Sequence, residues 1–338
     1  MGVGAKNIAN AGAKTADIND IYAIFYNPAG LTEIKSGEIA ISTQVDADLG
    51  YLNFLGIAYN FPIESLNLKI AVAFAYIPRL LMKASGTFRE GDFENTFLRF
   101  TLPKLSPNFT GDIDSKTDEY RFALAIAPLH NSLWSVGFSV GQINCASSFA
   151  GVTLEDPTNF TYITTVAKST ALGFGAKIYP TENITFGANL KNIDSKLDVK
   201  IYTVDDNGVR NETYEVNFPY DFTTGISIKY NDFLDLAADY QKIFGDYSGS
   251  PVDFQFIRLG STLKSQNMSY HLGLIAPISI DDGSGSNQEL PVPLLPTAGL
   301  GWHNEYVDLS IAFYIHPIMS LNEGKASPSA DISMSYIF

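Results

Sequence analysis

The chain has 338 residues, of which 46% are hydrophobic and 13% aromatic, while only 17% are charged, against roughly 25% in an average soluble domain. The net charge of −14 leaves no basic surface for nucleic acid, and the single cysteine, Cys145, excludes an internal disulfide and a cysteine-rich metal site. No run of about 18 apolar residues predicts a transmembrane helix, although a membrane β-barrel needs only alternate apolar residues. We therefore expect no nucleic-acid partner, no metal and no cofactor.

Residues 1–36 do not show the alternating pattern of a strand. They are mostly small, rich in Gly and Ala, and they end shortly after the motif Asn27-Pro28-Ala29-Gly30. Asn27 can cap a short helix that starts at Pro28, and Gly30 permits close backbone packing, although Asn-Pro is also common in ordinary turns. No basic segment followed by an apolar core opens the chain, so we expect either an intracellular protein or a mature form without its signal peptide.

From residue 37 onward, apolar residues alternate with polar or small ones. Ile184, Phe186 and Leu190, for example, alternate with Thr185 and Gly187. A period of two is typical of a strand with one apolar face, so the pattern predicts an all-β fold. It predicts fourteen strands, over residues 37–48, 52–61, 66–78, 118–127, 133–143, 164–179, 184–203, 214–230, 234–244, 253–264, 268–280, 293–303, 307–317 and 329–338.

The connections between these strands alternate in length. Every second one is a short turn, such as Pro180–Asn183, and those between are mostly longer, the longest being 79–117. An up-and-down barrel has its short turns at one rim and its long loops at the other, as bacterial outer-membrane barrels do. A lumen of fourteen strands is too wide to fill with side chains, so we expect the large apolar residues to face lipid. We therefore predict a closed, antiparallel, 14-stranded transmembrane β-barrel over residues 37–338, with a large soluble β protein as the alternative.

The 79–117 connection, which we predict to be a long extracellular loop, is rich in aromatic residues. Phe93, Phe97 and Phe100 have the spacing of one face of a short helix. Such a face is either an exposed surface that captures apolar ligands or part of a cap with its own small core over the barrel mouth. The alternating pattern places Arg121 on the lumenal face. There we expect it to pair either with a substrate carboxylate or with a lumenal aspartate. The candidate substrate-binding residues are Phe88, Phe93, Phe97, Phe100, Leu102 and Arg121.

The chain ends in a strand whose last residue is Phe338, with Tyr336, Met334 and Ile332 on the same face. A final strand that ends in Phe resembles the signal that outer-membrane barrels present to the barrel-assembly machinery. We therefore expect this machinery as a partner that contacts the chain at Phe338.

The small-residue start, the Asn27-Pro28-Ala29 motif before the first strand, the fourteen strands and the terminal Phe338 together make the chain resemble the FadL/TodX family. Members of that family are outer-membrane transporters of long-chain fatty acids and hydrophobic hydrocarbons, and the wider clan includes PorV-like barrels of bacterial secretion systems. The chain departs from the family in its shorter length and in residues 16–20, which lack the usual paired acids. Both departures concern the substrate more than the fold.

The resemblance implies a mechanism as well as a fold. Residues 1–36 are expected to form a hatch inside the lumen. Apolar loop surface is expected to capture the ligand, which passes to a lumenal pocket and leaves through a gap in the barrel wall into the membrane. We place the gap at Tyr76, Ile77 and Pro78, because proline interrupts strand pairing.

The sequence thus predicts a bacterial outer-membrane channel for hydrophobic small molecules, surrounded by membrane lipid and lipopolysaccharide, and we expect a monomer. The alternative is a PorV-like barrel that acts as a protein-secretion or surface-anchoring partner. No Ser/His/Asp or Asp/His cluster falls at one strand end, so we do not expect an enzyme. A continuous apolar tunnel would favour transport, and a sealed lumen with a broad loop surface would favour the secretion partner.

Overall fold

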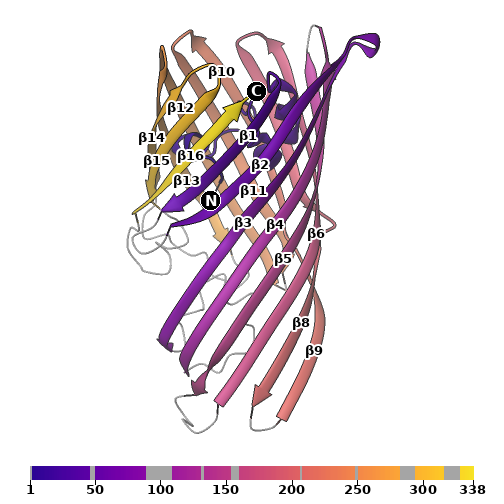
Figure 1. Cartoon of the computed structure of the whole chain (residues 1–338), viewed down its shortest axis with the longest axis vertical. Helices are drawn as coiled ribbons and strands as arrows, with labels where there is room; N and C mark the ends of the chain where they lie inside the picture. The colour runs from indigo at the N-terminus through magenta and orange to yellow at the C-terminus, as the bar shows by residue number, and fades with distance from the viewer. Residues whose placement is uncertain are drawn as a thin grey trace.

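The computed structural model describes residues 2–45, 50–88, 109–130, 133–153, 160–205, 208–247, 250–281, 294–315 and 328–338. The strands in these residues form one antiparallel sheet. The sheet closes on itself because β1 (Gly37–Val45) pairs with β16 (Pro328–Ile337) as well as with β2 (Gly50–Ile63). The result is the closed all-β barrel that the sequence predicts (Figure 1).

The other elements follow in chain order. The remaining strands are β3 (Leu68–Phe88), β4 (Phe109–Pro128), β5 (Trp134–Thr153), β6 (Phe160–Thr181), β7 (Ile184–Ile193), β8 (Lys196–Asp205), β9 (Gly208–Asn217), β10 (Tyr220–Asn231), β11 (Leu234–Tyr247), β12 (Ser250–Ser265), β13 (Met268–Asp281), β14 (Leu295–His303) and β15 (Val307–Ile315). The helices are α1 (Ala5–Ala9), α2 (Ala23–Tyr26) and the 3-10 helices η1 (Pro28–Glu33) and η2 (Glu64–Leu66). Within the described residues, no helix is long and apolar enough to cross a membrane.

Two strands of the wall are interrupted. β7 and β8 together pair along one edge of β6, with a break at Asp194, whose backbone is left-handed (φ 47°). β10 pairs with β7 and β9 pairs with β8, with a break beside Pro219, which has no N–H to donate to a strand ladder. When each interrupted strand is counted once, the described wall has fourteen strands, as predicted.

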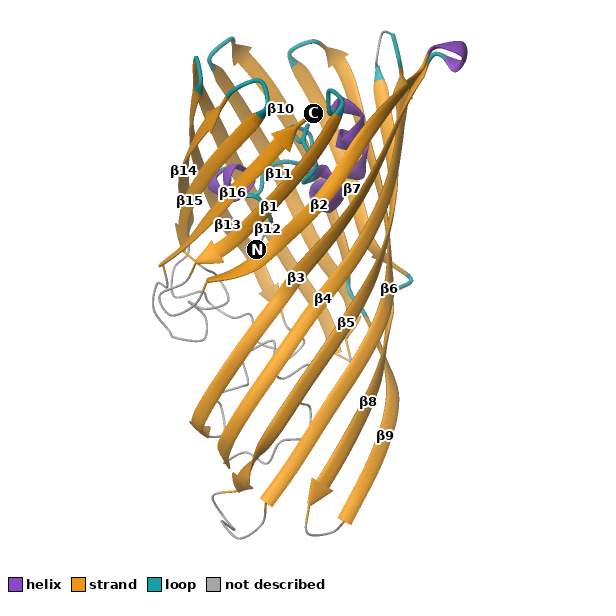
Figure 2. Cartoon of the chain, viewed as in Figure 1, coloured by secondary structure: helices purple, strands orange, loops and turns teal. Residues whose placement is uncertain are grey.

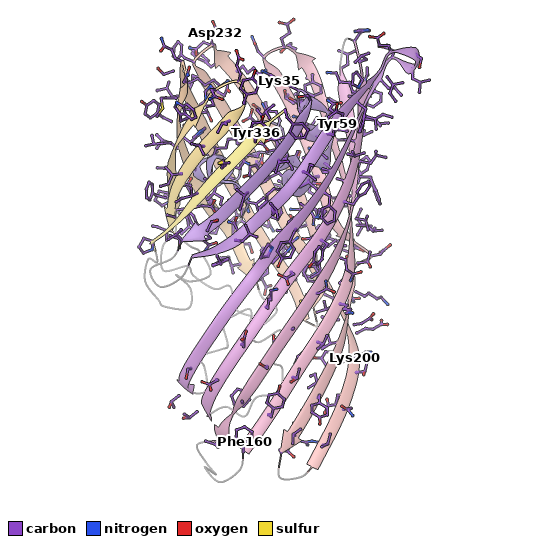
Figure 3. The ribbon with its side chains drawn as sticks, viewed as in Figure 1. Lys35, Tyr59, Phe160, Lys200, Asp232 and Tyr336 are labelled. Carbon is purple, nitrogen blue, oxygen red and sulfur yellow. The ribbon has the colours of Figure 1, made fainter. Side chains whose placement is uncertain are left out.

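Large apolar side chains point outward in the half of the barrel next to the short turns. Phe74 of β3 and Phe122 of β4 are paired across the strands and are 48% and 47% exposed, whereas Ala73 and Ala123, on the inner face, are buried. Tyr59 belongs to the same outer surface near the short-turn rim (Figure 3). We call this surface the apolar belt; it includes Ile39, Ile57, Phe74, Phe122, Phe138, Phe174, Phe186, Leu236, Leu259, Leu272, Leu300, Phe313 and Met334.

The wall is much taller on one side of the barrel. β3 to β6 have 20 to 22 residues each, whereas β14 and β15 have 9 each. Together with the β8–β9 hairpin, β3 to β6 extend well beyond the other strands (Figure 2). We call this part of the barrel the extended wall; it comprises residues 79–88, 109–118, 144–153, 160–168, 196–205 and 208–217.

The prediction that residues 79–117 form a loop is wrong for much of this range. Residues 79–88 continue β3 and residues 109–117 belong to β4, and the rest of that connection lies outside the described residues. The reason is that Asp112 and Lys116 make the outer face of β4 polar there, so the pattern no longer has the apolar face that marks a membrane strand. The extended wall shortens the predicted connections 144–163 and 204–213 in the same way.

The N-terminal segment, residues 2–36, precedes the wall and is largely buried against its inner face. The backbone N–H of Ala5 donates a hydrogen bond to Ser333 Oγ of β16 (3.1 Å). On another strand, Asp239 of β11 accepts a hydrogen bond from the backbone N–H of Lys14 (3.0 Å). Because the segment lacks long helices and sheet partners, polar side chains of the wall satisfy part of its backbone.

Candidate functional site

On the inner face of the extended wall, large buried apolar side chains lie among the buried hydroxyl residues Ser115, Thr117, Ser147 and Thr165. Ile113 of β4, Phe149 of β5 and Ile163 of β6 lie side by side in one cross-strand row, and all three are buried. On the outer face of β4, Asp112 and Asp114 are exposed. A concave wall with this polarity suits the apolar part of a ligand. We call the buried set the apolar cluster; it comprises Ile113, Ile143, Cys145, Phe149, Ile163, Ala167, Ala171, Leu197, Val199, Ile201, Val216 and Val252.

A charge cluster built around the buried Glu119 and Arg121 lies next to the apolar cluster, on the side of the belt. Glu119 is the cross-strand partner of Ile143, and its carboxylate accepts hydrogen bonds from Nε of Arg79 and Nε of Arg121, both at 2.6 Å. Arg121 also donates to the carbonyl oxygen of Ile24 in the N-terminal segment (3.2 Å). Because two guanidinium groups share one carboxylate, this group of side chains has a net positive charge where the inner face changes from apolar to polar.

Phe25 of the N-terminal segment contacts the same cations. Its ring centroid lies 5.5 Å from Cζ of Arg79, 6.0 Å from Cζ of Arg121 and 4.8 Å from Nζ of Lys191. Cations above an aromatic face are attracted by its quadrupole, an interaction of about 0.5–2 kcal/mol depending on exposure. Lys191 is itself held by an ion pair with Asp221 (2.9 Å). The N-terminal segment is therefore bound to charged side chains of β3, β4 and β7.

The Asn27 motif joins the N-terminal segment to the wall. Asn27 caps η1 as expected, because its Oδ1 accepts a hydrogen bond from the N–H of Ala29 (3.2 Å) and Pro28 occupies the first turn. Its Nδ2 donates to the carbonyl oxygens of Thr15 (2.8 Å) and of Ala176 in β6 (3.1 Å). All the motif residues are buried, so one side chain satisfies backbone groups of both the segment and the barrel.

Two glycines allow the close approach of this motif. A Cβ on Gly175 of β6 would lie 2.0 Å from Oδ1 of Asn27, and a Cβ on Gly30 would lie 2.5 Å from the carbonyl oxygen of Ile18. Neither distance is possible for a real side chain. Gly30 therefore has the close-packing role expected of it, and Gly175 supplies the matching space on the wall.

The predicted substrate-binding residues fall into three groups. Arg121 is buried and paired with the carboxylate of Glu119, so a lumenal acid is its partner here. Phe88 ends β3 at the far end of the extended wall, where its backbone pairs with Phe109. The other four, Phe93, Phe97, Phe100 and Leu102, lie outside the described residues.

The residues predicted to flank a gap lie where β2 and β3 separate. The β2–β3 ladder ends at the pair Leu55–Tyr76, and within the described ranges β3 beyond that point pairs only with β4. The hydroxyl of Tyr76 donates to Asp118 (2.7 Å), whereas Ile77 is buried. The β3–β4 register shifts directly after Pro78. The described wall is therefore split beside these residues.

Sequence analysis misses three members of this site, Phe25, Arg79 and Glu119. Glu119 has a readable signal, because it lies two residues before Arg121 and so shares a strand face with it. Arg79 falls in the stretch assigned to a loop, and no sequence pattern relates Phe25 to these charges. In the part of the chain that the structure describes, no group of His, Cys, Asp or Glu side chains is placed to hold a metal ion.

Comparison with known proteins bears on the fold. No family model matches the chain, and no curated protein matches it. Among solved structures, it is similar to the P. putida toluene transporter TodX, with 12% identity and a TM-score of 0.62, over 99% of this chain and 98% of that one. It is also similar to the Ralstonia pickettii toluene transporter TbuX, with 15% identity and a TM-score of 0.61, over 99% and 97%. For a Pseudomonas aeruginosa FadL homologue the values are 11% and 0.64, over 100% and 99%.

The chain has the FadL/TodX fold. At these sequence identities the likeness concerns the fold alone, and at that level the resemblance expected from the sequence is confirmed. The likeness extends over nearly the whole length of both chains.

Proposed function

We propose that this chain is a bacterial outer-membrane channel for the uptake of hydrophobic small molecules, either long-chain fatty acids or hydrocarbons. The observation that carries the proposal is the apolar cluster on the inner face of the extended wall. A water-filled pore has no use for such a surface, whereas a hydrophobic solute gains free energy by leaving water for it. TodX and TbuX, which share the fold, are toluene transporters, and this agrees with the same substrate class.

In this proposal the apolar belt contacts the hydrocarbon of the outer membrane. A tilted transmembrane strand needs about 9–11 residues, and the shortest full strands, β1, β14 and β15, have 9 each. The short turns then lie on the periplasmic side, and the extended wall projects to the outside, where its charged outer face meets lipopolysaccharide head groups and water. The chain would act as a monomer, because the sheet closes on itself through the β1–β16 pairing.

Residues 1–36 would act as the hatch inside the lumen. Its contacts with β6, β11 and β16 on different parts of the wall support this role, because a fourteen-strand barrel without a filling would pass polar solutes. Lys6 forms ion pairs with Asp20 (3.0 Å) and with Asp308 of β15 (3.1 Å). Burial alone would lower the pKa of Lys6, but the nearby carboxylates, Asp308 and Asp20 first among them, outweigh it and raise the pKa well above its usual value, so Lys6 stays protonated.

The ligand would pass from the outside to the apolar cluster and then leave through the split between β2 and β3. At the split, Phe54 of β2 and Ile77 of β3 are buried in one apolar group with Ile24 of the N-terminal segment. A ligand that moves past these side chains reaches the membrane without re-entering water. We keep Phe88, Phe93, Phe97, Phe100 and Leu102 as candidates for first capture, and Tyr76, Ile77 and Pro78 as candidates for the lateral opening.

A matched pair of variants on the extended wall tests the proposal. Val199 belongs to the apolar cluster, whereas Val166 of β6 faces outward and is 41% exposed. We expect Val199→Ser to weaken binding of a fluorescent long-chain fatty acid or of toluene by about tenfold, because the lost methyl groups no longer cover the ligand. Val166→Ser should leave binding unchanged.

The measurement is equilibrium binding by purified protein in detergent, followed by uptake into proteoliposomes. Equal effects of the two variants would contradict a binding role for the apolar cluster. If the wild-type protein binds no hydrophobic molecule and co-purifies instead with another polypeptide, the transport proposal fails and the secretion-partner alternative is favoured.

A further inference from the structure

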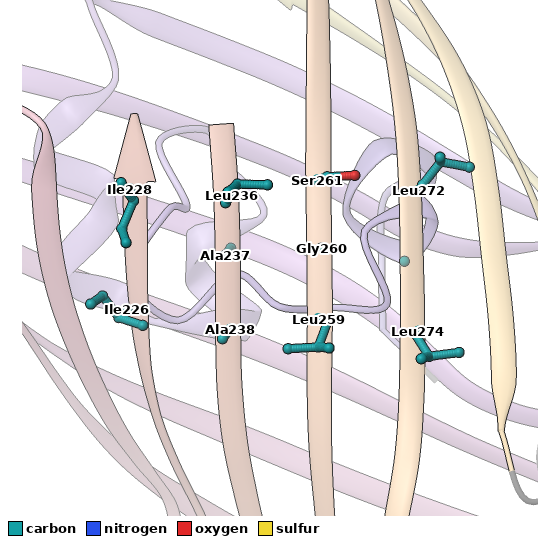
Figure 4. Close-up of a pocket in the computed structure, with 11 residues that line it drawn as sticks. Ile226, Ile228, Leu236, Ala237, Ala238, Leu259, Gly260, Ser261, Leu272 and Leu274 are labelled. Atoms are coloured by element: carbon teal, nitrogen blue, oxygen red, sulfur yellow. The ribbon is translucent and has the colours of Figure 1, made fainter. Parts of the chain in front are cut away.

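A groove on the outer surface of the barrel is distinct from the apolar cluster. It lies in the apolar belt, on β10 to β13, and has a volume of about 480 Å³ (Figure 4). Two rows of outward-facing side chains cross these four strands and form its sides. The rows are Ile226–Ala238–Leu259–Leu274 and Ile228–Leu236–Ser261–Leu272.

The groove exists because two small residues stand among large aliphatic ones. Ala238 and Ser261 occupy the two central strands, while every other outward position in the two rows carries Leu or Ile. At Phe74 and Phe122, by contrast, the paired outward positions carry bulky groups on both strands. A hollow lined by aliphatic groups gains dispersion contacts only when another aliphatic group enters it.

Two tyrosines fix the depth of the groove. Tyr230 and Tyr270 occupy the next outward positions toward the short-turn rim and are 71% and 45% exposed. Tyrosine prefers the membrane interface, with its ring in hydrocarbon and its hydroxyl among the head groups. Ile228 and Leu272 lie two residues deeper on the same strands. The groove therefore lies at the depth of acyl chains, directly beneath the head groups.

We propose that the groove binds an acyl chain of a membrane phospholipid, in the leaflet next to the short-turn rim. This inference rests on the proposed position of the belt in a membrane and concerns neither the apolar cluster nor the ligand route. A second copy of the chain is a poor occupant, because a two-fold interface brings the same patch together and would place hollow against hollow. A partner helix is also a poor fit, because helix packing in membranes needs a run of small residues, and here Ala238 and Ser261 are isolated.

The first test fills the groove. The variant Ala238→Leu/Ser261→Leu replaces both small residues, and Val72→Leu/Val140→Leu enlarges two lipid-facing residues on β3 and β5 as a control. Each protein is equilibrated with phosphatidylethanolamine in mild detergent, and retained phospholipid is counted by native mass spectrometry. We expect the wild type and the control to retain a phospholipid, and the filled variant to retain it about tenfold less, because the chain loses its buried methylene contacts.

The second test needs no change in the groove. Trp302 of β14 pairs with Met268 on the strand that carries Leu272, whereas Trp134 lies on β5, away from the groove. With phosphatidylethanolamine brominated on its acyl chains, Trp302 in a Trp134→Phe protein should be quenched at a lower lipid fraction than Trp134 in a Trp302→Phe protein. The proposal would be overturned if Trp302 and Trp134 were quenched at the same lipid fraction. It would also be overturned if the folded filled variant retained as much phospholipid as the wild type.

Two other outcomes would also overturn it. One is a retained mass that belongs to a second copy or to another polypeptide, and the other is retention of a fatty acid or hydrocarbon with no phospholipid. Uptake of the hydrophobic substrate into proteoliposomes, as in the test of the proposed function, separates this inference from that function. The filled variant should transport like the wild type. If the wild type itself transports no hydrophobic molecule, the proposed channel function is refuted, and the quenching experiment still decides whether the groove binds a phospholipid.

Discussion

The apolar belt and the extended wall are made from the same strands with opposite polarity. In β4, Phe122 faces outward in the belt and Asp114 faces outward in the extended wall, while the inner face changes from the small Ala123 to the buried Ile113. A strand presents alternate residues to two faces, and the surroundings of each face decide which one is apolar. On the proposed placement in the outer membrane, this difference means that the outer solvent changes along a single strand from hydrocarbon to water, and the inner face changes with it.

The charge cluster at Glu119 marks the change between the two regions on the inner face, and breaking it should have the largest effect. Glu119→Gln leaves the buried guanidinium of Arg121 without its counter-charge, which costs about 3–5 kcal/mol when a buried pair is broken. We expect a matching fall in the free energy of unfolding, measured by urea titration in detergent micelles.

The control is Glu215→Gln on the outer face of the extended wall. Glu215 pairs with Lys196, and both side chains are more than half exposed, at 62% and 60%. Exposed pairs contribute about 0–1 kcal/mol, so this variant should unfold nearly like the wild type. Similar losses in the two variants would show that the inner face at Glu119 is wet and that the boundary is misplaced.

A charge on the outer face should separate the belt from the extended wall directly. Leu124→Arg places a guanidinium in the belt, and Val166→Arg places one on the outer face of the extended wall. A lipid-facing Arg near the middle of a membrane costs a barrel about 2–4 kcal/mol, so Leu124→Arg should lower stability and the yield of inserted protein, while Val166→Arg should change neither. The measurement is the fraction of folded barrel in outer membranes, from its heat-dependent electrophoretic mobility, and equal yields would refute the membrane placement of the belt.

The belt could be predicted from sequence because its outward residues are large and its inward residues small, as Phe122 and Ala123 show. This contrast gave the right number of strands and the right outward direction. It failed in the extended wall, where Asp112-Ile113-Asp114 alternates with the reverse polarity and reads as a loop. A rule that accepts either face as the apolar one would have extended β4 to its true start.

The site was only partly predictable. Asn27 could be identified because a cap followed by proline is a local pattern, and its cap bond is confirmed. The contact of Phe25 with Arg79 and Lys191 joins residues far apart in the chain, and such contacts depend on how the barrel closes around the N-terminal segment. No local pattern contains that information.

The smallest expected effect concerns the N-terminal segment, which binds the inner wall of the belt half and contacts the extended wall at Arg79. Nζ of Lys14 forms an ion pair with Oδ2 of Asp17 at a distance of 2.5 Å. Burial alone would raise the pKa of Asp17, but the ammonium of Lys14 outweighs it and lowers the pKa. The carboxylate therefore stabilises the folded segment fully above its unfolded pKa of about 3.9, and this contribution is lost as the pH falls from there toward the folded value.

Hydrogen exchange at matched pH tests this. In the wild type, exchange of residues 2–36, corrected for intrinsic rates, should become faster as the pH falls through that window, because the stabilisation by the Asp17 carboxylate is lost. Asp17→Asn should show the faster exchange already at neutral pH and a smaller further rise, since other carboxylates still titrate. Exchange of residues 208–217 in the extended wall should be the same in both proteins. If it changes as much as that of the N-terminal segment, the two regions open together, and the boundary at Glu119 does not separate them in solution.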